Sequence, residues 1–209
     1  MDTSSKWCFM ALAQKEEKGY DLVNYKLFIP ERGRDNWLIK SFNDFISREE
    51  LLNLSGFILG KGPGSFTGLR ISYAFFKSLS MMTEIPLYEI NTLLLWEYLG
   101  VSDNARLFYQ FNKNLFYYRE NNKTLPLSIE QISNFFSDKD NRETRVWLAQ
   151  ENDNSRIEYW KTIWPDDAFL FLTPSAILSH ISPLEGDLIE SGWKSALPEY
   201  GDNLSAIFT

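Results

Sequence analysis

A glycine-rich turn between an apolar run and a long helical pattern places the strongest constraint on the fold. The segment from Phe57 to Ser80 reads FILGKGPGSFTGLRISYAFFKSLS and holds four of the chain's eleven glycines within nine residues. Glycine allows backbone angles and close approaches that a side chain forbids. The segment therefore predicts a short strand at residues 56–60, a turn, and a helix from about residue 68 to residue 83.

The turn departs from two common phosphate-binding fingerprints. The Walker pattern needs Gly-Lys followed by Ser or Thr, whereas Lys61 is followed by Gly62. The dinucleotide pattern needs its third glycine three residues after the second, and here Gly68 comes one residue late after Gly64. Pro63 also lacks a backbone N–H group. Neither fingerprint is present.

Two interpretations of the turn stay open at this point. The glycines allow tight packing of a helix on a sheet, or they form a cradle that presents backbone N–H groups to an anion at a helix N-terminus. Ser65 and Thr67 are candidate caps for the helix that follows.

Around this segment, strand and helix patterns alternate. Before it we expect a hairpin and a helix, and after it a strand and a helix that Asn91 caps, at residues 7–13, 21–29, 34–47, 85–90 and 92–99. The second half repeats this order less clearly, with strands at 106–111, 115–120, 144–150 and 168–172 and helices at 128–136, 155–161 and 174–181. The last stretch, from residue 183, is expected to be irregular. This alternation predicts an α/β fold with mixed sheets in two subdomains, residues 1–100 and 101–209.

The helix after the turn carries two apolar stripes. A helix that lies on its own sheet with its other side in water needs only one stripe. We assign the first stripe to the chain's own core and predict that the second contacts a partner; the alternative is that the chain's own loops cover it. The first stripe is Ile71, Phe75, Leu79 and Met82, and the second is Leu69, Tyr73 and Phe76.

Composition excludes several classes of function. A formal charge of −7 and a pI near 4.9 argue against direct nucleic-acid binding, which requires clustered Lys and Arg. The N-terminus lacks the pattern of a signal peptide, and no apolar run is long enough to cross a membrane, so we expect a cytoplasmic protein without a membrane segment. The chain has a single cysteine, Cys8, which leaves no disulfide framework.

No metal or catalytic constellation stands out. Cys8 and His180 supply the thiolate and the imidazole, and neither has a suitable neighbour in the sequence. We expect His180 to be a structural residue on a helix. The acidic pairs Asp138 with Asp140 and Asp166 with Asp167 lie in polar turns and are expected to be solvated. We predict no metal site and no catalytic residue in this chain.

These residues resemble a known family. The run GPGSFTGLR, the segment IPLYEI and the helix opening NTLLL resemble the bacterial TsaB (YeaZ) family over about forty residues. The motif loop consists of Gly62, Pro63, Gly64, Ser65, Phe66, Thr67, Gly68 and Arg70. Asp2, Thr3 and Ser4 look like the family's Asp-Thr-Ser turn, here a vestigial phosphate or metal turn.

The resemblance weakens outside this region. Family members have several apolar residues before the Asp-Thr-Ser turn, so either the start is placed late or most of the first strand is missing. In the second half, Lys113 and Tyr118 are loose counterparts of the family pattern, and Pro198 and Tyr200 resemble a remnant near the end.

What the resemblance implies is an actin-like, Hsp70-like ATPase-superfamily fold of the ribonuclease-H-like type, and a non-enzymatic scaffold role in making N6-threonylcarbamoyladenosine at position 37 of tRNA. It implies pairing with the catalytic subunit TsaD through helices of the first subdomain, with an ATPase, TsaE, joining. tRNA would be met only through the complex, and ATP and a metal would sit on partner subunits, with no cofactor bound by this chain alone.

Two other functions stay open. One is a stand-alone nucleotide-dependent phosphotransferase of the same superfamily that uses Asp2 and the glycine turn on phosphate. The other is a homodimeric binding protein, because a self-pairing surface has the same apolar pattern as a hetero-pairing one.

Overall fold

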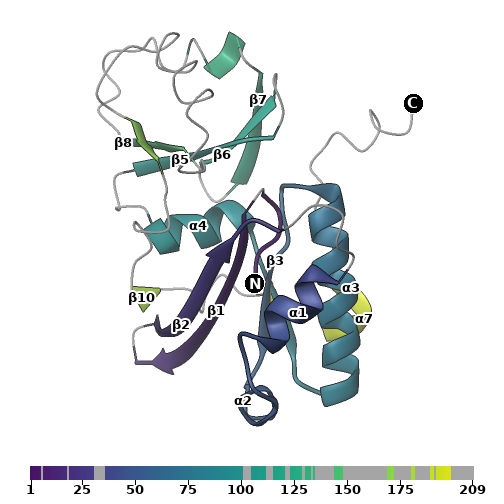
Figure 1. The fold of residues 1–209 in the computed structure, drawn as a ribbon. Coiled ribbons are helices and arrows are strands. Elements are labelled where there is room, and N and C mark those ends of the chain that lie inside the picture. The colour runs from purple at the N-terminus through teal and green to yellow at the C-terminus, as the bar shows by residue number, and fades with distance from the viewer. Residues whose placement is uncertain are drawn as a thin grey trace, which may run out of the picture. The chain divides into compact units, whose positions relative to one another are not determined.

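The computed structural model describes residues 1–5, 7–17, 19–30, 36–100, 105–111, 115–120, 123–128, 130–132, 134, 144–147, 169–171, 180–181, 189–190 and 192–198. The chain divides into two units, residues 1–92 with 180–209 and residues 93–179. This division differs from the predicted boundary at residue 100, because described segments near the end of the chain pair with strands of the first unit. Figure 1 labels most of the elements.

The first unit begins with the predicted hairpin, and the structure confirms it. β1 (Cys8–Glu16) and β2 (Gly19–Phe28) pair antiparallel, with a register shift between Leu12 and Ala13. β10 (His180–Ile181) extends this sheet by pairing with β2. The predicted helix at 174–181 is therefore wrong at its end, since these two residues take their hydrogen bonds from a neighbouring strand.

A second sheet carries the glycine-rich segment. β3 (Phe57–Gly60) and β4 (Leu87–Ile90) are parallel and are joined by α3 (Phe66–Thr83), as predicted. β11 (Ile189–Glu190) pairs antiparallel with the other edge of β4, and a short helix, α7 (Gly192–Ser195), follows it. The prediction of an irregular stretch after residue 183 is wrong for these two elements.

Met1 and Asp2 lie between the two sheets. Asp2 exchanges two backbone hydrogen bonds with Phe9 of β1, with N···O distances of 2.8 and 2.9 Å. Met1 donates from its amino group to the Ile58 carbonyl at 2.8 Å and accepts from the Gly60 N–H at 2.9 Å. These two residues therefore occupy the position of a central strand, with β1 and β2 on one side and β3 and β4 on the other.

Two helices replace the single one predicted at 34–47. α1 (Trp37–Asn43) ends before α2 (Arg48–Leu52), because Ser47 starts a new helix with a capping box. The Ser47 hydroxyl accepts from the Glu50 N–H at 3.2 Å, and the Glu50 carboxylate accepts from the Ser47 N–H at 2.9 Å. The sequence S-x-x-E at 47–50 is the signal that the periodicity argument passed over.

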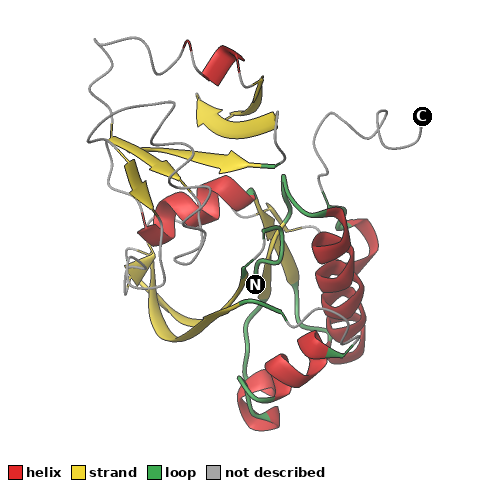
Figure 2. Cartoon of the chain, turned by 45° about the horizontal axis from the view of Figure 1, so that its top comes forward, coloured by secondary structure: helices red, strands yellow, loops and turns green. Residues whose placement is uncertain are grey.

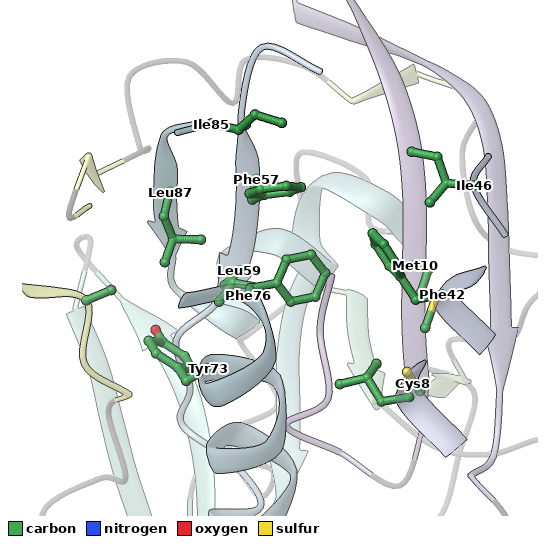
Figure 3. Packing of buried hydrophobic residues seen from close by; sticks show 12 residues of the cluster. Cys8, Met10, Phe42, Ile46, Phe57, Leu59, Tyr73, Phe76, Ile85 and Leu87 are labelled. Atoms are coloured by element: carbon green, nitrogen blue, oxygen red, sulfur yellow. The ribbon is translucent and has the colours of Figure 1, made fainter. Parts of the chain in front are cut away.

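The core of the first unit lies between α3, the sheets and α1 (Figure 3). Phe76 is its centre, with ring centroids 5.5 Å from Phe42 of α1 and 5.4 Å from Phe57 of β3. Edge-to-face pairs of this kind add to the free energy gained by burying the rings. The packing fixes α3 against the strand that leads into the glycine turn.

The second unit contains one mixed sheet, and the helix α4 (Thr92–Gly100) leads into it. The strand order is β7-β6-β5-β8-β9, with β5, β6 and β7 antiparallel and β8 and β9 parallel to β5. The strands are β5 (Ala105–Gln110), β6 (Leu115–Glu120), β7 (Lys123–Ser128), β8 (Thr144–Trp147) and β9 (Phe169–Phe171). β7 was not predicted, and the helix expected at 128–136 is described only at 130–132 and 134.

The two units share one strand order. In chain order the second sheet reads 3-2-1-4-5, and the first unit reads the same when residues 1–2 count as its first strand, followed by β1, β2, β3 and β4. The predicted repetition of an α/β subdomain with a mixed sheet is thus confirmed in the described strands. Figure 2 shows the strands and helices of both units. The helix predicted at 155–161 lies outside the described residues.

Candidate functional site

Each residue of the Asp2-Thr3-Ser4 turn lies against one glycine of the glycine-rich segment. A Cβ atom built at Gly60 would overlap the carboxylate of Asp2. A Cβ at Gly64 would overlap Ser4, and one at Gly68 would overlap the carbonyl oxygen of Thr3. The glycine spacing of four residues therefore matches three successive residues of the N-terminal turn, and a side chain at any of the three positions would force them apart.

Hydrogen bonds hold the Asp2 carboxylate in this turn. Its Oδ1 atom accepts from the Ser4 N–H at 3.2 Å and from the Thr92 hydroxyl at 3.3 Å, and its Oδ2 atom accepts from the Ser4 hydroxyl at 3.0 Å. Asp2 is only 1% exposed. A buried carboxylate requires such partners, because desolvation of an unpaired charge is costly.

Thr92 joins the turn to the motif loop. It donates its backbone N–H to the Gly62 carbonyl at 2.9 Å, and its hydroxyl accepts from the Gly62 N–H at 3.0 Å. Gly62 itself has a φ of 112°, in the region that favours glycine. Asp2, Thr92 and Gly62 therefore form one connected hydrogen-bonded group at the carboxyl ends of β3 and β4.

The start of α3 is fixed by the same turn. Ser65 donates its N–H to the Ser4 carbonyl, and its hydroxyl caps the helix by accepting from the Gly68 N–H at 3.2 Å, as predicted. The Thr3 hydroxyl lies 2.8 Å from the Gly68 carbonyl oxygen and 2.9 Å from the Ser72 hydroxyl. In this region the N–H groups of Gly62, Ser65 and Gly68 thus donate to the chain's own atoms, which favours the packing interpretation of the motif loop over the anion cradle.

The remaining motif residues lie at the edge of this region. Pro63 and Gly64 are buried, whereas Thr67 and Arg70 are exposed. The Arg70 guanidinium stacks on the Phe66 ring, 5.0 Å from its centroid. Arg70 therefore carries the positive charge of this loop at the exposed surface of α3.

The structure contradicts the assignment of the second stripe of α3 to a partner and supports the core assignment of the first stripe only at Phe75 and Leu79. Leu69, Tyr73 and Phe76 are 0%, 3% and 4% exposed, so the prediction that they form an exposed partner surface is wrong. These residues lie on the side of α3 that faces β3 and β4. The Tyr73 hydroxyl also donates a hydrogen bond to a buried acceptor, the Glu89 carboxylate.

The exposed side of α3 carries two residues of the first stripe, Ile71 and Met82. Phe75 and Leu79 are partly buried beside α1, with the Phe75 ring 5.1 Å from Phe42. Ile71, Met81 and Met82 are exposed, and Met82 is 77% exposed. We call Arg70, Ile71, Ala74, Ser78, Met81 and Met82, all exposed, the outer face of α3.

The other candidate residues form no site within the described part of the chain. No group of three or more His, Cys, Asp or Glu side chains there is arranged to hold a metal ion. Cys8 is buried, and burial raises the pKa of its thiol. His180 lies in β10 rather than on a helix. Asp138, Asp140, Asp166, Asp167, Lys113 and Tyr200 lie outside the described residues, Tyr118 is buried in β6, and Pro198 is the last residue described.

Comparison with known proteins agrees with this architecture. Residues 46–105, which include β3, α3, β4 and the whole of α4, match the TsaD family, tRNA N6-adenosine threonylcarbamoyltransferase. YeaZ from Pseudomonas aeruginosa superposes with a TM-score of 0.59 and 15% sequence identity, covering 96% of this chain and 97% of that one. The chain has a YeaZ-like fold.

A second structure supports the YeaZ-like fold. It is an uncharacterized protein with similarity to peptidase YeaZ from Pseudomonas aeruginosa, with a TM-score of 0.56, 17% identity, and coverage of 95% of this chain and 96% of that one. No curated protein matches the sequence. The YeaZ-like fold is of the actin-like type, as the sequence resemblance predicted.

Thr92 of this site and Glu89, the buried partner of Tyr73, were not predicted from the sequence. Thr92 was assigned only to the start of a helix, and Glu89 was not singled out. The signal for Thr92 is its position: the carboxyl ends of adjacent parallel strands meet at one edge, so a polar residue just after β4 lies near the glycine turn after β3. Glu89 is a carboxylate inside an apolar strand, a pattern that calls for a buried partner.

Proposed function

We propose that this chain is a cytoplasmic, non-catalytic subunit in the synthesis of N6-threonylcarbamoyladenosine at position 37 of tRNA. The observation that carries the proposal is the match of residues 46–105 to the TsaD family in a chain with a YeaZ-like fold. The acidic chain would meet tRNA through the complex, and ATP and a metal ion would be bound by partner subunits.

The proposed partner is a TsaD-like catalytic subunit, with a TsaE-like ATPase joining the pair. We place the contact on the outer face of α3, which lies within the matched segment. Its side chains include Ile71, Met81 and Met82, and exposed apolar groups gathered on one helix mark interaction surfaces. Methionine and arginine are enriched in such interfaces, and Arg70 lies at the end of the same face.

Reconstitution tests this proposal. The purified chain, threonine, bicarbonate, ATP, tRNA and the enzyme that makes threonylcarbamoyl-adenylate should give no modified nucleoside in mass spectrometry. Adding the TsaD-like and TsaE-like subunits of the same organism should give the product, and leaving out only this chain should reduce it by tenfold or more. Product without the TsaD-like subunit would show that this chain is itself an enzyme.

The phosphotransferase alternative is disfavoured by the geometry of Asp2. Both of its carboxylate oxygens accept hydrogen bonds from Ser4, and Oδ1 also accepts from Thr92, in a site closed by the glycines. A catalytic role on phosphate would require this group to open. Calorimetry with ATP and Mg²⁺ should detect no micromolar binding by the isolated chain, and such binding would favour the alternative.

A further inference from the structure

The last described segment of the chain packs onto α3 and β4, which it follows by more than a hundred residues. Ala196 is fully buried, and its carbonyl accepts from the Lys77 ammonium group of α3 at 2.9 Å. The Leu197 N–H donates to the Glu89 Oε1 atom at 3.1 Å. The segment is thus tied to a helix on one side and to a strand on the other.

Glu89 joins all three elements through one oxygen atom. Its Oε1 accepts from the Tyr73 hydroxyl of α3 at 2.5 Å as well as from Leu197, and the residue is only 7% exposed. Hydrogen bonds to a carboxylate are about twice as strong as those between neutral groups. Loss of this one side chain would therefore release both α3 and the terminal segment from their shared acceptor.

The attachment of the segment is small compared with the rest of the unit. β11 contributes two residues of pairing to β4, and α7 is four residues long. Small contacts of this kind open at a lower free energy than the whole domain. We propose that residues 192–197 form a clasp that opens and closes as a unit over Tyr73, and that Glu89 is the positioning residue that holds it closed.

The clasp lies at one border of the outer face of α3. Lys77, which binds Ala196, is next on the helix surface to Ala74 and Met81, both on that face. A closed clasp fixes this border in place. A role of the clasp in binding a TsaD-like partner rests on the proposed function, whereas the proposal that the clasp exists does not.

Hydrogen exchange followed by mass spectrometry on the full-length chain, without partners, tests the clasp. Glu89→Ala removes the hydrogen bonds from Tyr73 and Leu197, and Glu89→Gln keeps an oxygen that can accept them. The matched control is Ser80→Ala, which removes one buried hydrogen bond of α3, from the Ser80 hydroxyl to the Ile85 carbonyl at 2.6 Å, and does not touch the clasp. Amides at 194–197 should exchange at least tenfold faster in Glu89→Ala, faster by a smaller factor in Glu89→Gln, and within threefold of the wild-type rate in Ser80→Ala.

Tyr73→Phe keeps the test decisive if Glu89→Ala fails to fold. This variant retains the ring and removes the hydroxyl donor, so it should speed exchange at 194–197 more than Ser80→Ala does. Unchanged exchange in both Glu89→Ala and Tyr73→Phe, or equal acceleration by Ser80→Ala, would overturn the proposal. Because no partner is present, that failure is distinct from a failure of the proposed pairing.

Discussion

At the residue scale, the motif that most resembles a phosphate loop acts as the receptor for the chain's own N-terminal turn. Gly60, Gly64 and Gly68 each make room for one residue of Asp2-Thr3-Ser4. The sequence predicted the tight turn but not that the N-terminal turn packs against it. A pattern of glycines indicates where a Cβ atom would not fit, but it does not identify the neighbouring atoms.

Gly68→Ala should lower the free energy of unfolding by at least about 2 kcal/mol, although alanine is the better helix former. The added methyl group would overlap the Thr3 carbonyl, a backbone atom that cannot rotate away. The control is Gly56→Ala, whose Cβ would lie 2.7 Å from a ring atom of Tyr88, a side chain that can shift. Urea denaturation of both variants measures this, and equal losses would mean that the N-terminal turn is not packed as described.

Cys8 should react with a thiol reagent only when the chain unfolds. Burial, and then the charge of Asp2, raises the pKa of its thiol, so the folded state keeps the proton after the unfolded state has lost it. Stability contributed by this group is therefore present at neutral pH and lost as the pH rises above about 8.5, the ordinary range of a thiol. Rapid labelling at neutral pH in the absence of denaturant would contradict the burial of Cys8.

At the element scale, α3 shows what helical periodicity can and cannot predict. Two apolar stripes were correctly identified, and the helix is indeed covered twice, by the sheet and at one edge by α1. The second stripe faces the sheet instead of a partner, and the first stripe packs against the core only at Phe75 and Leu79, because hydrophobicity alone does not say which stripe faces the sheet. Tyr73 was assigned to a partner surface as part of the second stripe, yet its hydroxyl donates to the buried Glu89 carboxylate.

Phe76→Glu should unfold the chain, and Met82→Glu should leave it folded. The first would place an unpaired carboxylate among Phe42, Phe57 and Phe75, at a cost of several kcal/mol. The second would place one in water, where surface changes usually alter stability by about 0.5 kcal/mol or less. Circular dichroism melting of the two variants decides between this orientation of α3 and the opposite one, in which the effects would be exchanged.

At the scale of the whole molecule, local patterns predicted the hairpin, the strand-turn-helix segment and the repetition of an α/β unit. They missed β11 and α7, whose places depend on pairing with β4 from far along the chain. They also missed Thr92 as a partner of Asp2, ninety residues away. Such contacts leave no periodicity in the sequence.

No helix among the described residues is both long and apolar enough to cross a bilayer.

The proposed function places the contact with a TsaD-like subunit on the outer face of α3. Its most direct test is the dissociation constant for the TsaD-like protein of the same organism, measured by calorimetry on the wild-type chain, Met82→Glu and Val23→Glu. Val23 is 60% exposed on β2, away from α3, and serves as the matched control. We expect micromolar or tighter binding by the wild-type chain, at least tenfold weaker binding by Met82→Glu, and no change in Val23→Glu. Absence of binding by the wild-type chain, or equal binding by all three proteins, would contradict the proposed pairing through the outer face of α3.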